Sequence, residues 1–184
     1  MTWSAFRPVS SLFGRFARSE NGNATVEFVI VFPAILMVML SGIELGFVTL
    51  HHSMLERALD ITVREIRLGT GTAPQHDEIK DMICDYAGFI DDCSTNLRLE
   101  MIQVDPDNWS SIPSDADCTD QSEDVAPVRS FVNGLENELM ILRACAKIDP
   151  VFPTTALGKA LDEGGDNAGQ YALISLSAFV QEPK

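Results

Sequence analysis

The feature that most constrains this chain is an apolar run from Phe28 to Leu50. A helix needs roughly 20 apolar residues to cross the hydrocarbon core of a bilayer, so the run predicts a membrane span over about 28–50. Glu27 stands directly before the run, and Glu44 lies within it. A carboxylate at the bilayer centre costs roughly 2.5–3.5 kcal/mol on insertion scales, and such a residue usually has a partner. Glu27 therefore indicates a function, whereas we expect Glu44 near the outer membrane boundary, where a carboxylate costs little.

The helix is expected to continue beyond the span. The following sequence, "SMLERALDITVREIRLGTG", keeps apolar residues on one stripe at helical spacing. Gly69, with Arg67 in the preceding turn, is typical of a helix end. Pro33 lies in the apolar part and is expected to bend the helix, which membrane helices tolerate better than soluble ones do. The pattern predicts one long helix over 23–69.

Charge is distributed unevenly along the chain. Residues 1–22 carry a net charge of +2, and residues 70–184 carry -14 from seven basic and 21 acidic side chains. By the positive-inside rule, the N-terminus stays in the cytoplasm and the acidic domain lies in the periplasm of a bacterium. A secretory signal has its small-residue cleavage site after the apolar stretch, whereas here the order is inverted. So acidic a domain lacks the basic footprint that nucleic-acid binding requires, which argues against a nucleic-acid partner.

All four cysteines follow the span. They form no CxxC motif and no zinc-ligand spacing with the histidines. Two disulfides in an oxidising compartment are the economical interpretation, against free buried thiols or a metal site. Three pairings are possible, of which proximity in sequence favours Cys84 with Cys93 and Cys118 with Cys145.

Residues 70–184 carry the patterns of a mixed α+β domain. "HDEIKDMICDYAGFI" predicts a short helix with Asp77 as its cap. "NLRLEMIQV" alternates Leu97, Leu99 and Met101 against Arg98, Glu100 and Ile102, which predicts a strand. Two more strands are expected in "NELMILRACAKI" and "QYALISLSAFVQ", with a turn region at "LGKALDEGGDNAG" between them. We expect about three antiparallel strands packed on the second half of the long helix.

The sequence contains no constellation typical of an enzyme. There is no GxSxG motif, and "GTGTAPQ" lacks the lysine and length of a phosphate-binding loop. The pair His51 and His52 is most simply interfacial, with metal binding as the alternative. The acidic clusters do not follow EF-hand spacing, so a solvated acidic face is favoured over calcium binding. We therefore predict no catalytic residues, no cofactor and no metal site.

Residues 22–46, "GNATVEFVIVFPAILMVMLSGIELG", resemble the TadE-like segment of the pseudopilins of tight-adherence (Tad/Flp) pilus systems, which are related to type IV pili. The resemblance covers about a quarter of the chain and says nothing specific about residues 70–184. It rests on the features Gly22, Glu27, Phe28, Pro33, Gly42, Glu44 and Gly46.

The resemblance implies that a membrane-embedded prepilin peptidase cuts after Gly22, so that residues 1–22 are a cytoplasmic leader. The mature chain would begin at Asn23 and place Glu27 fifth. In related pilins this glutamate is thought to pair with the new N-terminal amine of a neighbouring subunit during assembly, beside an aromatic residue that matches Phe28. An adjacent ammonium offsets much of the cost of burying a carboxylate. The alternative is that Glu27 lies at headgroup level and reaches water.

These observations together predict a minor pilin or pseudopilin with a pilin-like fold, anchored in the bacterial inner membrane by a single span. Its expected partners are the prepilin peptidase, another pseudopilin or the major pilin, and the inner-membrane assembly platform. Its expected roles are pilus assembly, adhesion or biofilm formation, and it could enter the pilus itself. The alternative is an unprocessed, single-span membrane-anchored periplasmic binding module that keeps residues 1–22.

Overall fold

A computed structural model describes residues 23–68, 74–107, 112–113, 116, 118, 131–161 and 169–183 of the chain. The chain divides into two compact units, Met1–Leu40 and Ser41–Lys184. One long helix, α2 (Asn23–Leu68), contributes residues to both units. The expected long helix is thus present, and it ends at the residue before Gly69.

The described part of the first unit is helical and apolar. Every residue from Ala24 to Ile35 is exposed. Pro33 lies inside the helix, where its ring nitrogen leaves the carbonyl of Val29 without the usual helical donor. A helix that is apolar all round needs a membrane or other helices to cover it. Within the described ranges, one helix, Ala24–Leu68, is long and apolar enough to cross a membrane, and its most apolar stretch is unburied.

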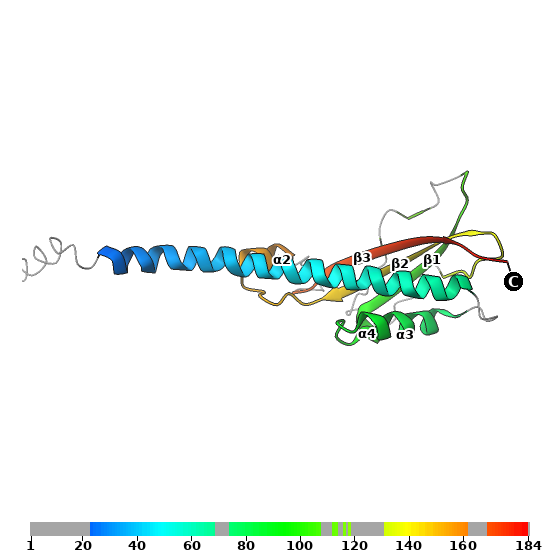
Figure 1. Cartoon of the computed structure of the whole chain (residues 1–184), viewed down its shortest axis with the longest axis horizontal. Helices are drawn as coiled ribbons and strands as arrows, with labels where there is room; N and C mark the ends of the chain where they lie inside the picture. The colour runs from blue at the N-terminus through cyan, green and yellow to red at the C-terminus, as the bar shows by residue number, and fades with distance from the viewer. Residues whose placement is uncertain are drawn as a thin grey trace, which may run out of the picture. The chain divides into compact units, whose positions relative to one another are not determined.

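The second unit contains a three-stranded antiparallel sheet in the order β1 (Leu97–Val104), β2 (Leu139–Ile148) and β3 (Tyr171–Val180). In the register, Leu99 faces Ala144, and Ala144 faces Ser175. Figure 1 shows the three strands beside the second half of α2. The α+β class and the antiparallel sheet are as the sequence predicts.

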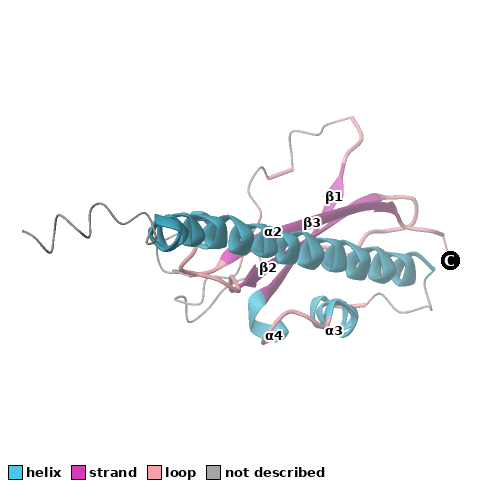
Figure 2. Cartoon of the chain, turned by 60° about the vertical axis from the view of Figure 1, so that its left-hand side comes forward, coloured by secondary structure: helices cyan, strands magenta, loops and turns pink. Residues whose placement is uncertain are grey.

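The core lies between the sheet and two helices. The apolar stripe of α2, with Leu55 and Leu59 fully buried, packs with α3 (His76–Ala87) on the inward sheet face. Figure 2 shows α2 across the sheet and α3 beside it. Polar contacts fix α2 along β3: the imidazole of His52 bonds the carbonyl of Ile174 over 3.2 Å, and Arg67 pairs with Glu182 at 3.2 Å. The core sits where the amphipathic part of the helix begins.

The outward face of the sheet is covered over β1 and β2 and open over β3. Arg98, Glu100 and Arg143 point away from the core, yet each is at most 8% exposed. On β3, by contrast, Ile174 is 45% exposed and Leu176 is 52% exposed. The simple inward and outward alternation predicted for "NLRLEMIQV" is therefore incomplete, because both faces of β1 are buried.

Two local predictions are wrong. The cap of α3 is Gln75, whose backbone N–H donates to the Glu78 carboxylate over 3.0 Å in a capping box; Asp77 lies inside the helix instead. The expected turn region after residue 156 begins with a short helix, α5 (Ala156–Leu161). A second short helix, α4 (Cys93–Asn96), precedes β1.

Candidate functional site

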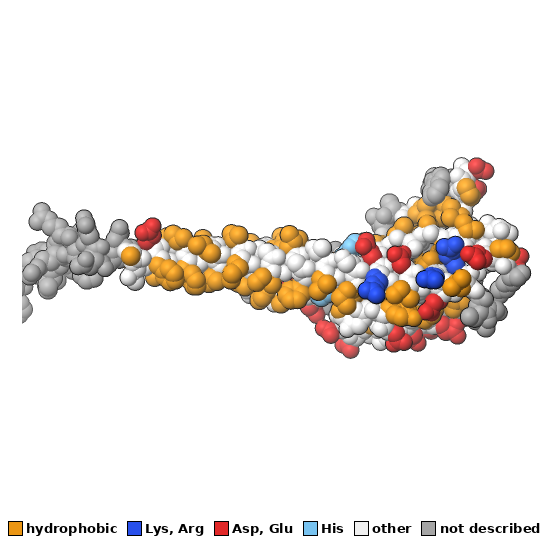
Figure 3. Space-filling model, in the orientation of Figure 1, with side chains coloured by type: hydrophobic (Ala, Val, Ile, Leu, Met, Phe, Trp, Pro, Cys, Tyr) orange, Lys and Arg blue, Asp and Glu red, His pale blue; other side chains and the backbone are white. Residues whose placement is uncertain are grey.

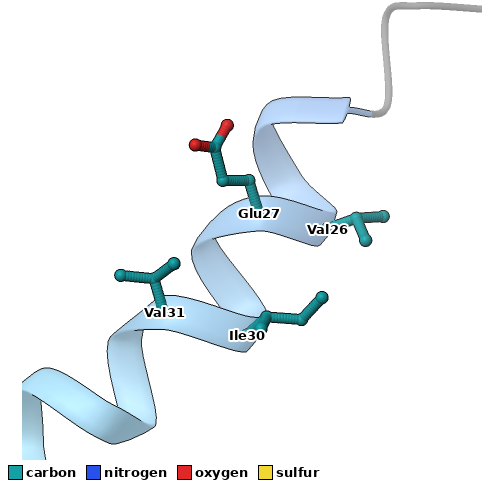
Figure 4. A pocket seen from close by; sticks show the side chains of 4 residues that line it. All are labelled: Val26, Glu27, Ile30 and Val31. Carbon is teal, nitrogen blue, oxygen red and sulfur yellow. The ribbon is translucent and has the colours of Figure 1, made fainter.

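The N-terminal turn of α2 carries the residues expected to act in assembly. Figure 4 shows Glu27 and Val31 projecting from one side of the helix and Val26 and Ile30 from the other. The Glu27 side chain is exposed, and no residue described by the structure donates a hydrogen bond to it. Glu27 is the fifth residue of α2 and follows its first turn, which contains no acidic residue. The assembly role expected for Glu27 stays a prediction.

Phe28 follows Glu27 and is 59% exposed. Its ring stacks on that of Phe32, with centroids 4.8 Å apart and an interplanar angle of 22°. This stacked pair is an i, i+4 contact, which stabilises the helix locally. Phe28 thus belongs to the exposed apolar surface of the first unit and to no core of this chain within the described residues.

The predicted processing site lies at the start of the helix. Gly22 falls outside the described residues, and α2 begins at the next residue, Asn23. The residue that would become the N-terminus of the mature chain is therefore the first helical residue. Whether cleavage occurs there stays a prediction.

The main site that sequence reasoning missed is at Glu44. Its side chain is fully buried, and both carboxylate oxygens accept backbone hydrogen bonds from the segment after β2. The Val151 N–H donates to Oε1 over 3.0 Å, and the Phe152 N–H donates to Oε2 over 2.8 Å. We expected Glu44 near the outer membrane boundary, which stays a prediction, and did not identify its backbone donors, the first of which lies 107 residues later in the chain.

The segment that holds Glu44 comprises residues 149–155, called the 149–155 loop below. Its backbone turns at Phe152, whose carbonyl accepts both the N–H of Thr155 over 3.1 Å and its hydroxyl over 2.9 Å. Gly158 in α5 is buried against this turn, and a Cβ there would lie 2.2 Å from the Phe152 carbonyl oxygen. A glycine is therefore required for α5 to pack on the loop. The prolines in "DPVFPTT" signalled a fixed loop, but nothing in the sequence pointed to Glu44.

A second loop meets α2 at His51, about two helical turns after Glu44. The ring of His51 stacks on Phe89 with centroids 4.7 Å apart and an interplanar angle of 9°. Burial lowers the pKa of His51, although the carboxylates of Glu44 and Asp91 act in the opposite direction. His52 instead lies beside Glu56 at 3.5 Å. The two adjacent histidines thus have separate contacts.

Glu44 also influences the pKa of Tyr171, at the start of β3. Burial, with the Glu44 and Asp149 carboxylates as smaller causes, raises the pKa of Tyr171 to about 12. Desolvation disfavours the phenolate, and nearby negative charges disfavour it further. Glu44 thus lies at a point where α2, the 149–155 loop and β3 come together.

The cysteines form two disulfides, Cys84–Cys93 and Cys118–Cys145, which are the pairs nearest in sequence. The first links α3 to the start of α4, and the second attaches residue 118 to the outward face of β2. On this side Arg143 also donates to the Pro113 carbonyl over 3.0 Å. Both links belong to the architecture of the second unit.

The part of the chain that the structure describes holds no group of three or more histidine, cysteine or carboxylate residues arranged to bind a metal ion. Figure 3 shows carboxylates spread over the folded unit and hydrophobic side chains along the helix that precedes it. The chemistry that these residues offer is therefore hydrogen bonding, charge pairing and apolar packing.

Comparison with known proteins bears on almost the whole of α2. Residues 22–64 match the family model described as TadE-like protein. This segment is TadE-like. The TadE-like segment includes Glu27, Phe28, Pro33 and Glu44, and it supports an association with tight-adherence pili. None of the curated proteins or solved structures compared with the chain matches it significantly, so residues 65–184 are interpreted from their own structure.

Proposed function

We propose that the chain is a minor pilin, or pseudopilin, of a tight-adherence pilus system, and that it acts in pilus assembly. The observation that carries this proposal is the exposed apolar surface at the N-terminal end of α2. Its apolar side chains are exposed from Ala24 to Ile35, and its single acidic residue there, Glu27, is exposed among them. The TadE-like match over residues 22–64 supports the same conclusion.

In this proposal the helix has two successive environments. Before assembly, a bilayer covers the apolar surface, with the basic N-terminal flank in the cytoplasm and the acidic unit in the periplasm. During assembly, equivalent helices of the major pilin or of another pseudopilin replace the lipid. Adhesion and biofilm formation would follow from the pilus and need no ligand site on this chain.

The proposed maturation step is cleavage after Gly22 by a prepilin peptidase. Cleavage creates an ammonium at Asn23, directly at the N-terminus of α2. An ammonium on one subunit and the Glu27 carboxylate on its neighbour would neutralise each other at low dielectric, where an unpaired charge is expensive. The assembly platform in the inner membrane would bring the two subunits together.

The mass of the mature chain tests the proposal. In cells that contain the peptidase, we expect loss of Met1–Gly22 from the wild type and a full-length chain for Gly22→Val, because bulk beside the scissile bond obstructs the protease. Gly42→Val is the matched control, since a Cβ at Gly42 meets no atom within 4 Å and lies far from the cut. If the wild-type chain keeps residues 1–22, an unprocessed membrane-anchored binding module becomes the better account.

A further inference from the structure

The second unit has an apolar surface around the Glu44 site. On α2, Ile43 is 42% exposed, Leu45 is 57% exposed and Leu50 is 52% exposed. On the 149–155 loop, Val151 is 47% exposed, and Pro153 beside it is also exposed. The hydrogen bonds from Val151 and Phe152 to Glu44 hold these loop residues against the helix. The apolar surface of the span thus continues onto a loop of the folded unit.

The loop backbone is suited to an environment without water. Residues 150–155 include two prolines, Pro150 and Pro153, which have no N–H to satisfy. Of the other four residues, Val151 and Phe152 donate to Glu44, and Thr155 donates to the Phe152 carbonyl. At membrane depth, irregular backbone is tolerated where its polar groups are satisfied within the protein. Most of the N–H groups of this loop meet that condition.

After its first residue, Asp149, the loop lacks the charge that dominates the rest of its unit. Residues 150–155 contain no charged side chain, although residues 70–184 contain 21 acidic ones. The nearest charged residues in sequence, Asp149 and Lys159, stand on either side and are exposed. An uncharged segment with exposed apolar side chains, such as residues 150–155 in so acidic a domain, is typical of a surface that avoids water.

The position of Glu44 on the helix indicates how deep the loop would lie in the bilayer. Glu44 precedes Leu50, the end of the apolar run, by six residues, which is about 9 Å of helix. Elements that lie in the membrane interface typically bury their apolar face about 5–10 Å into the boundary between headgroups and acyl chains. The loop atoms bound to Glu44 therefore lie at that depth if the run ends at the membrane surface.

We propose that the 149–155 loop is a second membrane contact, in which Val151, Phe152 and Pro153 enter the outer interfacial region of the bilayer. Glu44 is the positioning residue that fixes the loop at this depth. The proposal rests on the membrane anchoring of α2 given under the proposed function. A lipid surface is the occupant because the loop is attached to the apolar run itself, inside the part of α2 that a bilayer would cover.

The proposal also explains a carboxylate within an apolar run. A glutamate alone would raise the cost of inserting the helix, and two free N–H groups would raise the cost of inserting the loop. In the folded unit the two loop N–H groups donate to the Glu44 carboxylate, so both costs fall. Hydrogen bonds to an ionised acceptor are about twice as strong as neutral ones. The helix and the loop can therefore enter the interface as one unit.

Quenching of tryptophan fluorescence by lipids with brominated acyl chains tests the contact. The full chain is reconstituted in phospholipid vesicles with both native tryptophans, Trp3 and Trp109, replaced by phenylalanine. Three variants each carry one tryptophan: Val151→Trp in the loop, Val38→Trp in the apolar run, and Leu135→Trp as the water control. Val38 and Leu135 are 75% and 72% exposed, so neither substitution disturbs a core.

We expect bromolipid to quench the tryptophans at positions 38 and 151 and to leave the one at position 135 unchanged. If position 38 is quenched and position 151 behaves like position 135, the loop contact is wrong and the anchor stands. If position 38 is not quenched, the anchor itself is wrong, and with it the proposed function. Each result thus assigns the failure to one proposal.

A further variant tests the role of Glu44. In the Val151→Trp background, Glu44→Gln keeps the shape of the side chain but replaces one accepting oxygen by a donating amide. We expect quenching at position 151 to fall while quenching at position 38 is unchanged. Glu56→Gln, on an exposed side chain of the same helix, is the matched control and should change neither. Unchanged quenching at position 151 in Glu44→Gln would overturn the positioning role.

Discussion

Glu100 of β1 and Arg143 of β2 stand directly opposite each other on the outward sheet face and form a buried ion pair of 3.2 Å. Their side chains are 4% and 7% exposed. Arg143 donates a further hydrogen bond to the carbonyl of Pro113, so the pair joins two strands and the segment that covers them. A buried charge without its partner is far more costly than a buried pair.

Removing one member of this pair should destabilise the folded unit strongly. We expect Glu100→Ala to lower the free energy of unfolding by about 3–5 kcal/mol, because the buried Arg143 guanidinium then loses this carboxylate. The double variant Glu100→Leu with Arg143→Met should recover much of the loss. Denaturant titration in detergent micelles measures the free energy of unfolding of the wild type, the single variant and the double variant. Glu182→Ala, which breaks the exposed pair with Arg67, should cost no more than about 1 kcal/mol.

The two disulfides should stabilise the fold to different extents. In the chain-entropy model, the nine-residue separation of Cys84–Cys93 is worth about 2.7 kcal/mol, and the 27-residue separation of Cys118–Cys145 is worth about 3.6 kcal/mol. Replacing each pair by alanine should therefore lower the unfolding midpoint more for the second pair. Non-reducing peptide mapping of periplasm-derived protein checks the pairing first. Four alkylatable thiols there would contradict both bonds.

Tyr171 should make the fold sensitive to alkali. Its pKa is raised to about 12 in the folded state, so between its ordinary pKa of about 10 and that value the unfolded chain loses the phenolic proton first. The stabilising contribution is complete below pH about 10 and is lost as the pH rises towards 12. The free energy of unfolding of the wild type should therefore fall between pH about 10 and 12, and we expect Tyr171→Phe to reduce this fall by less than about 3 kcal/mol. Thermal unfolding at several alkaline pH values measures the effect, and equal declines in both proteins would contradict it.

Gly158→Ala should displace the 149–155 loop. The new Cβ would meet the Phe152 carbonyl oxygen, so the loop or α5 must move, at a typical cost of about 1–3 kcal/mol for overpacking. The better helix propensity of alanine offsets part of this cost. Gly46→Ala, where a Cβ has open space, provides the control and should not destabilise the protein. The two unfolding temperatures, compared in the same detergent, decide the point.

Glu27→Gln should impair assembly and leave the folded unit intact. The substitution keeps the shape of the side chain and removes the charge that would pair with a neighbouring amine. Because Glu27 is exposed and both disulfides lie in the second unit, we expect normal insertion, processing and disulfides. Pilus counts on cells, with co-purification of the partner pseudopilin, measure the defect. Full piliation would favour a glutamate that merely reaches water at headgroup level.

Much of the fold could be predicted because its signals are local. The long helix follows from an apolar run and a helical stripe with no strong stop before Gly69. The inward face of β1 follows from the alternation of Leu97, Leu99 and Met101, all of which are buried in the core. Periodicity reports which side chains share a face, and here it did so correctly.

The remainder depends on contacts between residues far apart in sequence. Alternation placed Arg98 and Glu100 on the face of β1 opposite its core side chains, yet both are buried. The pattern around Glu44 suggested a tolerated carboxylate, and its two donors lie more than a hundred residues later. Backbone N–H groups occur at every residue except proline, so the sequence does not indicate which of them will bind a side chain. A site built from them becomes visible only when the chain is folded.

The packing of α2 on the sheet also bears on biosynthesis. The buried stripe with Leu55 and Leu59 precedes all three strands that cover it, and the last of these ends at Val180. At about 5–20 residues per second, a ribosome needs roughly 6–22 s to make the stretch between Leu68 and Val180. On the proposed orientation, the stripe waits outside the membrane for that interval without its partner surface. On this orientation, the sheet can complete the burial of the stripe only after β3 has been exported.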